Sequence, residues 1–303
     1  MGSGSFDANA YRTYTSSVST KTRDEIYTSR TIHKDLDPKG VKIRESRDST
    51  DNPKSTPIIV GLDVTGSMGY LAENIAKEGL GTLFQGILDR KPVSDPHIMF
   101  MGIGDAACDK APLQVSQFEA DNRIVTQLTN LFLEKGGGGN CNESYDFPWY
   151  FAARHTVHDS MIKRGKRGYL FTVGDEEIPQ VLTKNQLQKF LGYSPEVDVP
   201  AKISLEEAQR QYDVFHVVIE EGDHYRRAAT AVRNSWQNLL GQRVIFLPDH
   251  KLLAQTIVSA IQVAEGADTT KAVSGWGGRA SSIIGNAVSN LPRGVPAPKR
   301  LGR

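Results

Sequence analysis

Runs of apolar, largely β-branched residues alternate with segments of helical spacing through the middle of the chain, and this alternation most constrains the fold. The runs that predict strands are residues 57–64, 97–103, 169–173, 213–219 and 244–247. The segments that predict helices are residues 71–88, 121–134, 145–161, 184–190, 203–211, 225–240 and 252–264. Strands that are apolar throughout and separated by helices form parallel sheets with both faces covered. Right-handed crossovers then lead to a doubly wound layer.

One pair of predicted strands departs from this pattern. Residues 97–103 and 113–118 are joined by a loop without helical spacing, and the second run alternates apolar and polar side chains. A short connection of this kind favours a hairpin over a crossover. The sequence therefore predicts an α/β, doubly wound, mostly parallel sheet with one antiparallel edge strand and helices on both faces.

The two ends of the chain differ in composition from residues 57–266, which we take as the domain. Residues 1–56 are rich in Ser, Thr and mixed charge with almost no apolar periodicity. They predict an extended polar arm, either disordered or adding a strand to a partner or to the domain. Residues 267–303 contain basic side chains and no acid after Asp268, which predicts a flexible basic tail. The alternatives for the tail are a short docking helix around residues 280–290 or a weak contact with a polyanion.

Composition excludes several classes of protein. The 36 Lys and Arg residues nearly balance the 35 Asp and Glu residues, so no global charge marks a nucleic-acid or membrane binder. The two cysteines are too few for a disulfide framework or a four-cysteine zinc site. Neither a membrane-spanning run nor a signal sequence is found, so we expect a cytoplasmic protein.

Oxygen-bearing side chains follow the first predicted strand. Asp63, Thr65 and Ser67 alternate along the chain just where that strand ends. In open α/β sheets, ligands bind beyond the carboxyl ends of the strands. One carboxylate with two hydroxyl groups suits a hard octahedral cation such as Mg²⁺, and suits zinc poorly because no His or Cys joins them.

Two further loops are predicted to reach the same edge of the sheet. Asp175 follows the strand at 169–173, and the glycine block 136–139 leads into residues 140–144 before a predicted helix. Asn140 or Glu143 in this middle loop could supply a third oxygen ligand. The convergence of three such loops predicts a metal site.

These motifs resemble the von Willebrand factor A family and its metal-ion-dependent adhesion site. The family motif Asp-x-Ser/Thr-x-Ser is matched by Asp63, Thr65 and Ser67, and the later family Asp is matched by Asp175. The resemblance covers roughly residues 57–266. It implies Mg²⁺ or Mn²⁺ held directly or through water by the first three residues, and by Asp175 usually through water. An acidic residue of a partner takes the open coordination position.

The middle loop departs from the family pattern. The family usually has Thr directly after the glycines, whereas here Gly139 is followed by Asn140. Asn140, Glu143 or Ser144 would have to substitute. If Glu143 faces the ion, the site is more negatively charged than usual and depends less on a partner's carboxylate.

The function implied by the resemblance is an intracellular, metal-dependent protein–protein interaction module or scaffold, and not an enzyme. Intracellular members commonly act as scaffolds or as adaptors, so an AAA+ ATPase or a multi-protein assembly is a plausible partner. Occupation of the open position could also shift the last helix, at 252–264.

Two other functions stay open. Asp63 at the end of the first strand is similar to the nucleophile of haloacid-dehalogenase enzymes, which would mean Mg²⁺-dependent phosphoryl transfer or hydrolysis. That class has a second Asp two residues later, where Thr65 stands. The third possibility is binding of nucleic acid or an anionic surface by the tail and the basic turn at 163–167.

Overall fold

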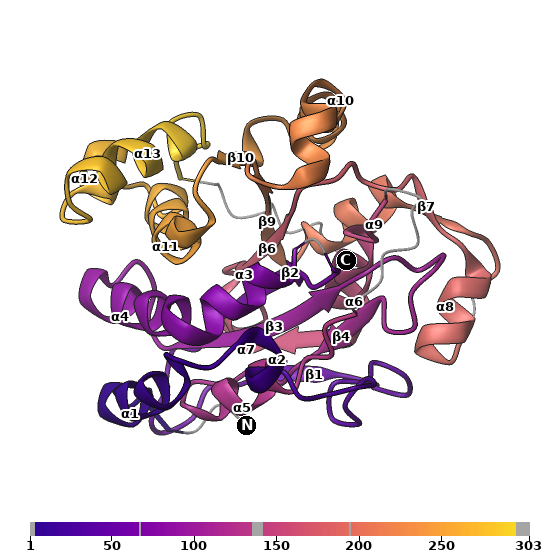
Figure 1. The fold of residues 1–303 in the computed structure, drawn as a ribbon, viewed down its shortest axis with the longest axis horizontal. Helices are drawn as coiled ribbons and strands as arrows, with labels where there is room; N and C mark the ends of the chain where they lie inside the picture. The colour runs from indigo at the N-terminus through magenta and orange to yellow at the C-terminus, as the bar shows by residue number, and fades with distance from the viewer. Residues whose placement is uncertain (1–3, 67, 135–141, 194, 295–303) are drawn as a thin grey trace.

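A six-stranded sheet forms the centre of the protein (Figure 1). The computed structural model describes residues 4–66, 68–134, 142–193 and 195–294. The strand order is β10-β9-β6-β2-β3-β4, with every pair parallel except β3 and β4. The strands are β2 (Thr56–Asp63), β3 (Pro96–Ile103), β4 (Leu113–Val115), β6 (Gly168–Gly174), β9 (Tyr212–Ile219) and β10 (Val244–Leu247). The predicted doubly wound α/β fold with one antiparallel edge strand is confirmed.

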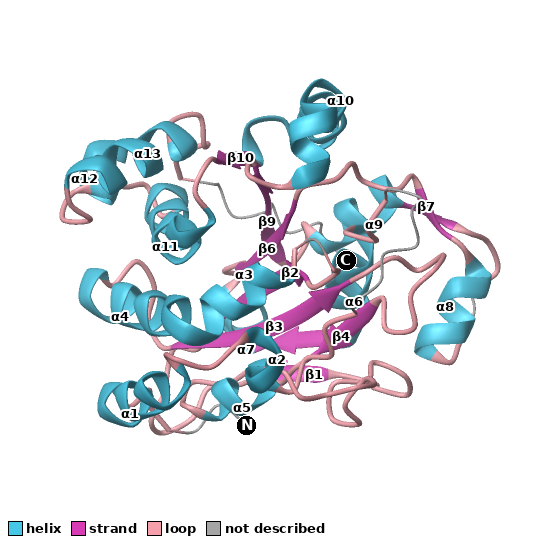
Figure 2. Ribbon diagram, in the orientation of Figure 1, coloured by secondary structure: helices cyan, strands magenta, loops and turns pink. Residues whose placement is uncertain are grey.

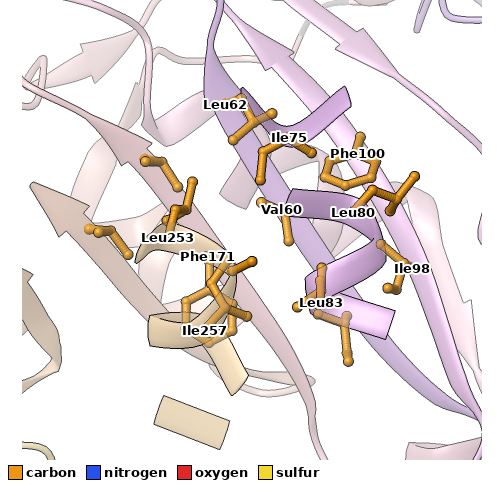
Figure 3. Packing of buried hydrophobic residues seen from close by; sticks show 14 of the residues in the cluster. Val60, Leu62, Ile75, Leu80, Leu83, Ile98, Phe100, Phe171, Leu253 and Ile257 are labelled. Carbon is orange, nitrogen blue, oxygen red and sulfur yellow. The ribbon is translucent and has the colours of Figure 1, made fainter. Parts of the chain in front are cut away.

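Helices lie on both sides of this sheet (Figure 2). One side carries α3 (Gly69–Asn74), η1 (Ile75–Gly79), α4 (Leu80–Arg90), α5 (Arg123–Thr129) and α11 (Leu253–Ala264). The other side carries α6 (Asp146–His155), α8 (Lys184–Leu191), α9 (Ala201–Ala208) and α10 (Asp223–Leu240). Side chains alternate between the two faces of a strand. Val60 and Leu62 therefore belong to the cluster that includes side chains of α4 and α11 (Figure 3). Ile59 belongs to the cluster on the opposite side.

The predicted helix at 145–161 is interrupted in the structure. Helix α6 ends at His155, and β5 (Thr156–His158) pairs in parallel with β1 (Arg44–Ser46) before α7 (Asp159–Arg164) begins. The interruption has a local cause, because the β-branched pair Thr156–Val157 favours extended backbone. The pairing partner lies more than a hundred residues away in the sequence, so helical periodicity alone did not indicate it.

The amino-terminal segment differs from the expected extended arm. It forms α1 (Ala8–Val18) and α2 (Arg23–Ile26), which pack against the helix that follows β2. The hydroxyl group of Tyr27 donates to the carbonyl of Ala72 at 2.6 Å. Tyr11 is buried against α4, where a Cβ atom on Gly81 would lie 2.3 Å from its ring. A few aromatic side chains thus anchor a segment whose composition is otherwise polar.

The carboxy-terminal segment also folds onto the domain, contrary to the predicted flexible tail. Helices α12 (Thr269–Val273) and α13 (Gly278–Val288) pack on α11, and α13 is the docking helix considered as an alternative. Ile284 and Val288 are fully buried there. Residues 295–303 of the predicted tail lie outside the described part of the chain.

The smaller elements lie at the periphery. Strands β7 (Val181–Leu182) and β8 (Val199–Pro200) pair antiparallel beside α8, and short 3₁₀ helices η2 (Gly241–Arg243) and η3 (His250–Leu252) flank β10. Within the described residues, no helix combines the length and hydropathy needed to cross a membrane.

Candidate metal centre

The candidate centre lies where β2 and β6 end. Asp63 is the last residue of β2, Asp175 follows β6 directly, and Glu143 lies just before α6. All three are buried carboxylates. Thr65 lies beside Asp63, whereas Ser67 and Asn140 are outside the described residues. The structure therefore brings together Asp63, Thr65, Asp175 and Glu143 of the predicted set.

Asp63 has no exposed surface and accepts three hydrogen bonds. Its Oδ1 accepts from the backbone N–H of Thr65 at 3.0 Å and from the Thr65 hydroxyl at 2.6 Å. Its Oδ2 accepts from the Tyr145 hydroxyl at 3.0 Å. Burial, together with repulsion from Asp175, raises the pKa of Asp63 above its ordinary value, although these hydrogen bonds oppose the rise.

Asp175 is 1% exposed, and one of its two carboxylate oxygens accepts a hydrogen bond. Its Oδ2 accepts the backbone N–H of His224 at 2.9 Å, at the start of α10, whereas its Oδ1 is buried without a hydrogen-bond partner. Burial raises the pKa of Asp175, and the backbone donors at His224 and Tyr225 oppose this. A Cβ atom on Gly222 would lie 2.2 Å from Oδ2, so only glycine leaves room for the carboxylate.

Glu143 is the described middle-loop residue that faces the other carboxylates. It is 7% exposed, and its Oε2 has no hydrogen-bond partner among the described residues. Burial and then repulsion from Asp63, Glu176, Asp109 and Asp105 raise the pKa of Glu143 well above its ordinary value. The Ser144 hydroxyl, in contrast, accepts a hydrogen bond from the backbone N–H of Ala106 at 2.9 Å, and so contacts the loop after β3.

Tyr145 contributes a hydrogen bond to Asp63 in the centre, and the sequence did not predict this role. Its ring is fully buried and meets His216 and Trp236 edge-on at centroid distances of 5.0 and 5.5 Å. A Cβ atom on Gly174 would lie 2.0 Å from the Tyr145 hydroxyl. The only signal in the sequence is its position next to the middle loop, since nothing there predicts that it reaches Asp63.

Glu176 and Glu177 form the rim beside His224. The His224 Nε2 atom lies 2.6 Å from the Glu177 carboxylate, and its Nδ1 atom lies 3.9 Å from that of Glu176. Asn142, Glu177 and His224 also line a hollow of about 580 Å³ next to the centre. Glu176 and Glu177 thus form an acidic rim that is partly buried and paired with a histidine.

A second acidic group, also missed from the sequence, follows β9 and β10. It is the one trio of acidic or histidine side chains in the described residues whose ligand atoms all lie within 4.8 Å of one another: Glu221, Asp249 and His250. His250 binds Glu221 through both its backbone N–H and its Nδ1 atom, at 2.8 and 2.7 Å. The sequence signal was present, because these acids follow predicted strands.

The residues at the centre fit a hard divalent cation. Within the described part of the chain, the buried oxygens Asp175 Oδ1 and Glu143 Oε2 have no hydrogen-bond partner. No lysine or arginine of the described residues forms an ion pair with Asp63, Asp175 or Glu143. At least one pair of their ligand atoms lies farther apart than 4.8 Å. A cation bound here would therefore keep water molecules among its ligands, as Mg²⁺ usually does.

Comparison with known proteins gives only a distant structural likeness. No protein-family model and no curated protein sequence matches the chain. The pilus adhesin SpaC from Lactobacillus rhamnosus GG is similar in structure, with a TM-score of 0.44 and 10% identity over 72% of this chain. Its open conformation gives a TM-score of 0.43 and 9% identity, again over 72% of this chain. This chain spans only 32% and 31% of those chains, and a likeness of this degree says nothing about function.

Proposed function

We propose that the protein is a metal-dependent protein–protein interaction module of the von Willebrand factor A type. Asp63, Thr65, Asp175 and Glu143 would hold Mg²⁺ or Mn²⁺, together with Ser67 and Asn140 from the sequence motif. The bound ion supplies a positive charge at the sheet edge, which an Asp or Glu side chain of a partner would meet.

One observation supports this proposal above all. Three buried carboxylates, one at the end of β2 and two in loops, lie at one edge of the sheet, and no described lysine or arginine forms an ion pair with them. Uncompensated buried charge is costly, so such a group either stays protonated or binds a cation. The unpartnered oxygens of Asp175 and Glu143 are the atoms that an ion would satisfy.

The surroundings of Asp63 support a binding role over a catalytic one. Both oxygens of this fully buried carboxylate already accept hydrogen bonds, from Thr65 and Tyr145. Oδ1 accepts two hydrogen bonds and Oδ2 accepts one from the described residues, so Oδ2 is the oxygen that keeps a lone pair for a cation. A nucleophile in phosphoryl transfer would need an oxygen exposed to the substrate.

The partner would present one carboxylate to the ion, and the acidic rim favours basic residues around that carboxylate. An AAA+ ATPase or a multi-protein assembly in the cytoplasm is the partner class that we propose from the family resemblance.

The test combines metal binding with partner capture. Calorimetry with Mg²⁺ on the wild-type chain should give binding that Asp63→Asn and Asp175→Asn each remove, whereas Asp89→Asn, an exposed change on α4, should leave it intact. In pull-downs, the partner should be retained with Mg²⁺ and lost with EDTA or with Asp63→Asn. Partners retained equally in all conditions would show that binding does not run through the metal.

A further inference from the structure

We infer that the hollow beside the metal centre receives an arginine or lysine side chain of the partner, so that the partner presents an acidic and a basic residue close together in its sequence. This inference rests on the proposed function, because the carboxylate on the ion fixes where the partner lies. The hollow measures about 580 Å³, within the range of roughly 300–1,000 Å³ that is typical of ligand pockets. Its walls come from the segment that follows Asp175 and from one face of α10, and include Glu177, Pro179, Gln180, His224, Ala231 and Ser235.

The hollow and the metal centre adjoin each other at two places. His224 donates its backbone N–H to Asp175 Oδ2 at 2.9 Å, while its imidazole Nε2 lies 2.6 Å from Glu177 in the wall of the hollow. Asn142 lines the hollow and directly precedes Glu143 of the centre. Because Asp175 and Glu177 are two positions apart, their Cα atoms are separated by about 7 Å at most. A partner segment with a carboxylate on the ion can therefore reach the hollow with a side chain within about three positions of that carboxylate.

The charge of the wall nearest the centre favours a cationic side chain. Glu176 and Glu177 both lie close to His224, whose Nδ1 and Nε2 atoms are 3.9 and 2.6 Å from their carboxylates. Within the described residues, no lysine or arginine forms an ion pair with either glutamate. Two carboxylates beside one histidine leave a negative charge in either protonation state of the imidazole. A basic partner side chain therefore complements this wall.

Two hydrogen bonds join the walls of the hollow to each other. Trp236 on α10 donates its indole N–H to the carbonyl of Glu176 at 2.8 Å. The Ser235 hydroxyl accepts the backbone N–H of Ile178 at 3.4 Å. These bonds fasten the segment that follows Asp175 to α10. A pocket whose walls are already joined loses little freedom when a side chain enters it, which favours binding.

The rest of the lining suits both parts of a long basic side chain. Pro179 and Ala231 offer apolar surface for its methylene groups. Glu177, Gln180 and Ser235 carry oxygens that can accept hydrogen bonds from its charged head. An apolar partner side chain would instead bury the Glu177 carboxylate without supplying a donor, which is unfavourable.

The experiment selects peptides on the full-length protein. A phage-displayed library of random peptides is panned on the immobilised wild type in Mg²⁺. We expect the enriched peptides to carry Asp or Glu with Arg or Lys within about three positions. Glu177→Gln removes the negative charge of the hollow, and Ala231→Lys places a basic side chain in it. On either variant the acidic residue should persist among the enriched peptides, and the basic residue should be lost. The matched control is Glu206→Gln, an exposed change on α9 that should select both.

One enriched peptide then gives the size of the effect by calorimetry in Mg²⁺. Replacement of its basic residue by Ala should weaken binding to the wild type about tenfold or more, because a charge-assisted hydrogen bond is lost. The same replacement should change the affinity for Glu177→Gln much less. An equal loss of affinity on both proteins would overturn the inference, since the basic residue would then bind elsewhere.

The outcomes separate this inference from the proposed function. Enriched peptides with an acidic residue and no basic one would overturn the inference and leave the proposed function standing. A basic residue enriched equally on the wild type, Glu177→Gln and Ala231→Lys would also overturn the inference. Peptides whose basic residue depends on Glu177, but which bind equally in Mg²⁺ and EDTA, would overturn the proposed function and retain the hollow as a site for a basic side chain. Enrichment of neither residue would overturn both. Circular dichroism checks that each variant folds, and either variant alone is sufficient.

Discussion

The hydroxyl of Tyr145 donates to Oδ2 of Asp63 at 3.0 Å, although the two residues are 82 positions apart in the chain. The bond ties the residue after the middle loop to the end of the first sheet strand. Among the described residues, it also supplies the only hydrogen bond to this oxygen. The Asp63–Tyr145 pair is therefore the link between the motif and the loop that carries Glu143.

Replacement of Tyr145 by Phe should destabilise the cation-free protein. It leaves Asp63 Oδ2 buried without its donor, which costs about 1–3 kcal/mol. Urea unfolding in EDTA measures the change in the free energy of unfolding. Tyr193→Phe, which removes a partly buried hydroxyl far from the sheet edge, serves as the comparison. An unchanged midpoint for Tyr145→Phe would mean that the bond contributes nothing.

Gly222→Ala should weaken cation binding by displacing Asp175. The new Cβ atom would lie 2.2 Å from the Asp175 carboxylate, which must then shift at a cost of about 1–3 kcal/mol. Calorimetry with Mg²⁺ measures the affinity. The matched control is Gly278→Ala at the start of α13, where the added Cβ meets nothing within 4 Å. Equal Mg²⁺ affinity in both variants would contradict the placement of Asp175.

The contribution of Asp63 and Glu143 to the stability of the cation-free protein should fall as the pH rises. Burial raises the pKa values of Asp63 and Glu143 in the folded state above their unfolded values. The folded state therefore binds more protons, and the resulting stability is complete below about pH 4 and declines from there through neutral pH. Thermal unfolding in EDTA across this range, compared with Asp63→Asn and Glu143→Gln, measures the decline. A stability that rises between pH 5 and 8 in the wild type but not in the variants would refute it.

Addition of Mg²⁺ at neutral pH should reverse this loss. An ion that binds only the folded state adds about 2.7 kcal/mol at a hundred times its dissociation constant. The midpoint of thermal unfolding should rise with Mg²⁺ concentration in the wild type and stay constant in Asp63→Asn. A rise of equal size in both proteins would place the stabilising ion elsewhere.

Asp48→Asn should loosen the segment around β1, which Asp48 ties to Lys163 and Arg164 by ion pairs. Asp48 pairs with Arg164 at 2.8 Å and with Lys163 at 3.2 Å. Burial would raise the pKa of Asp48, but hydrogen bonds from Arg164, Ser55 and Lys163 outweigh it and hold the pKa below its ordinary value. Hydrogen exchange of β1 should accelerate in Asp48→Asn and be unchanged in Asp89→Asn. Equal exchange in all three proteins would show that other contacts hold the segment.

Residues close together in the sequence account for what could be predicted. The sequence predicts strands β2, β3, β6, β9 and β10 as apolar runs. A strand that is buried on both faces of a sheet needs apolar side chains at successive positions. The contact between Thr65 and Asp63 could be predicted because the two residues are only two positions apart, so the Thr65 hydroxyl reaches the Asp63 carboxylate. Asp175 could be placed because parallel strands deliver their ends to one edge.

The sequence by itself therefore determined the layered sheet and the edge at which the acidic residues gather. Tertiary structure alone decided that Tyr145 reaches Asp63, that Asp105 lies beside the segment of Glu143, and that both chain ends fold onto the domain. Tyr11 rests on Gly81, and Trp276 lies against the Arg90 guanidinium at 3.6 Å. The physical reason is that each of these contacts stabilises its segment only through a surface built by distant residues, so no local periodicity or composition records it.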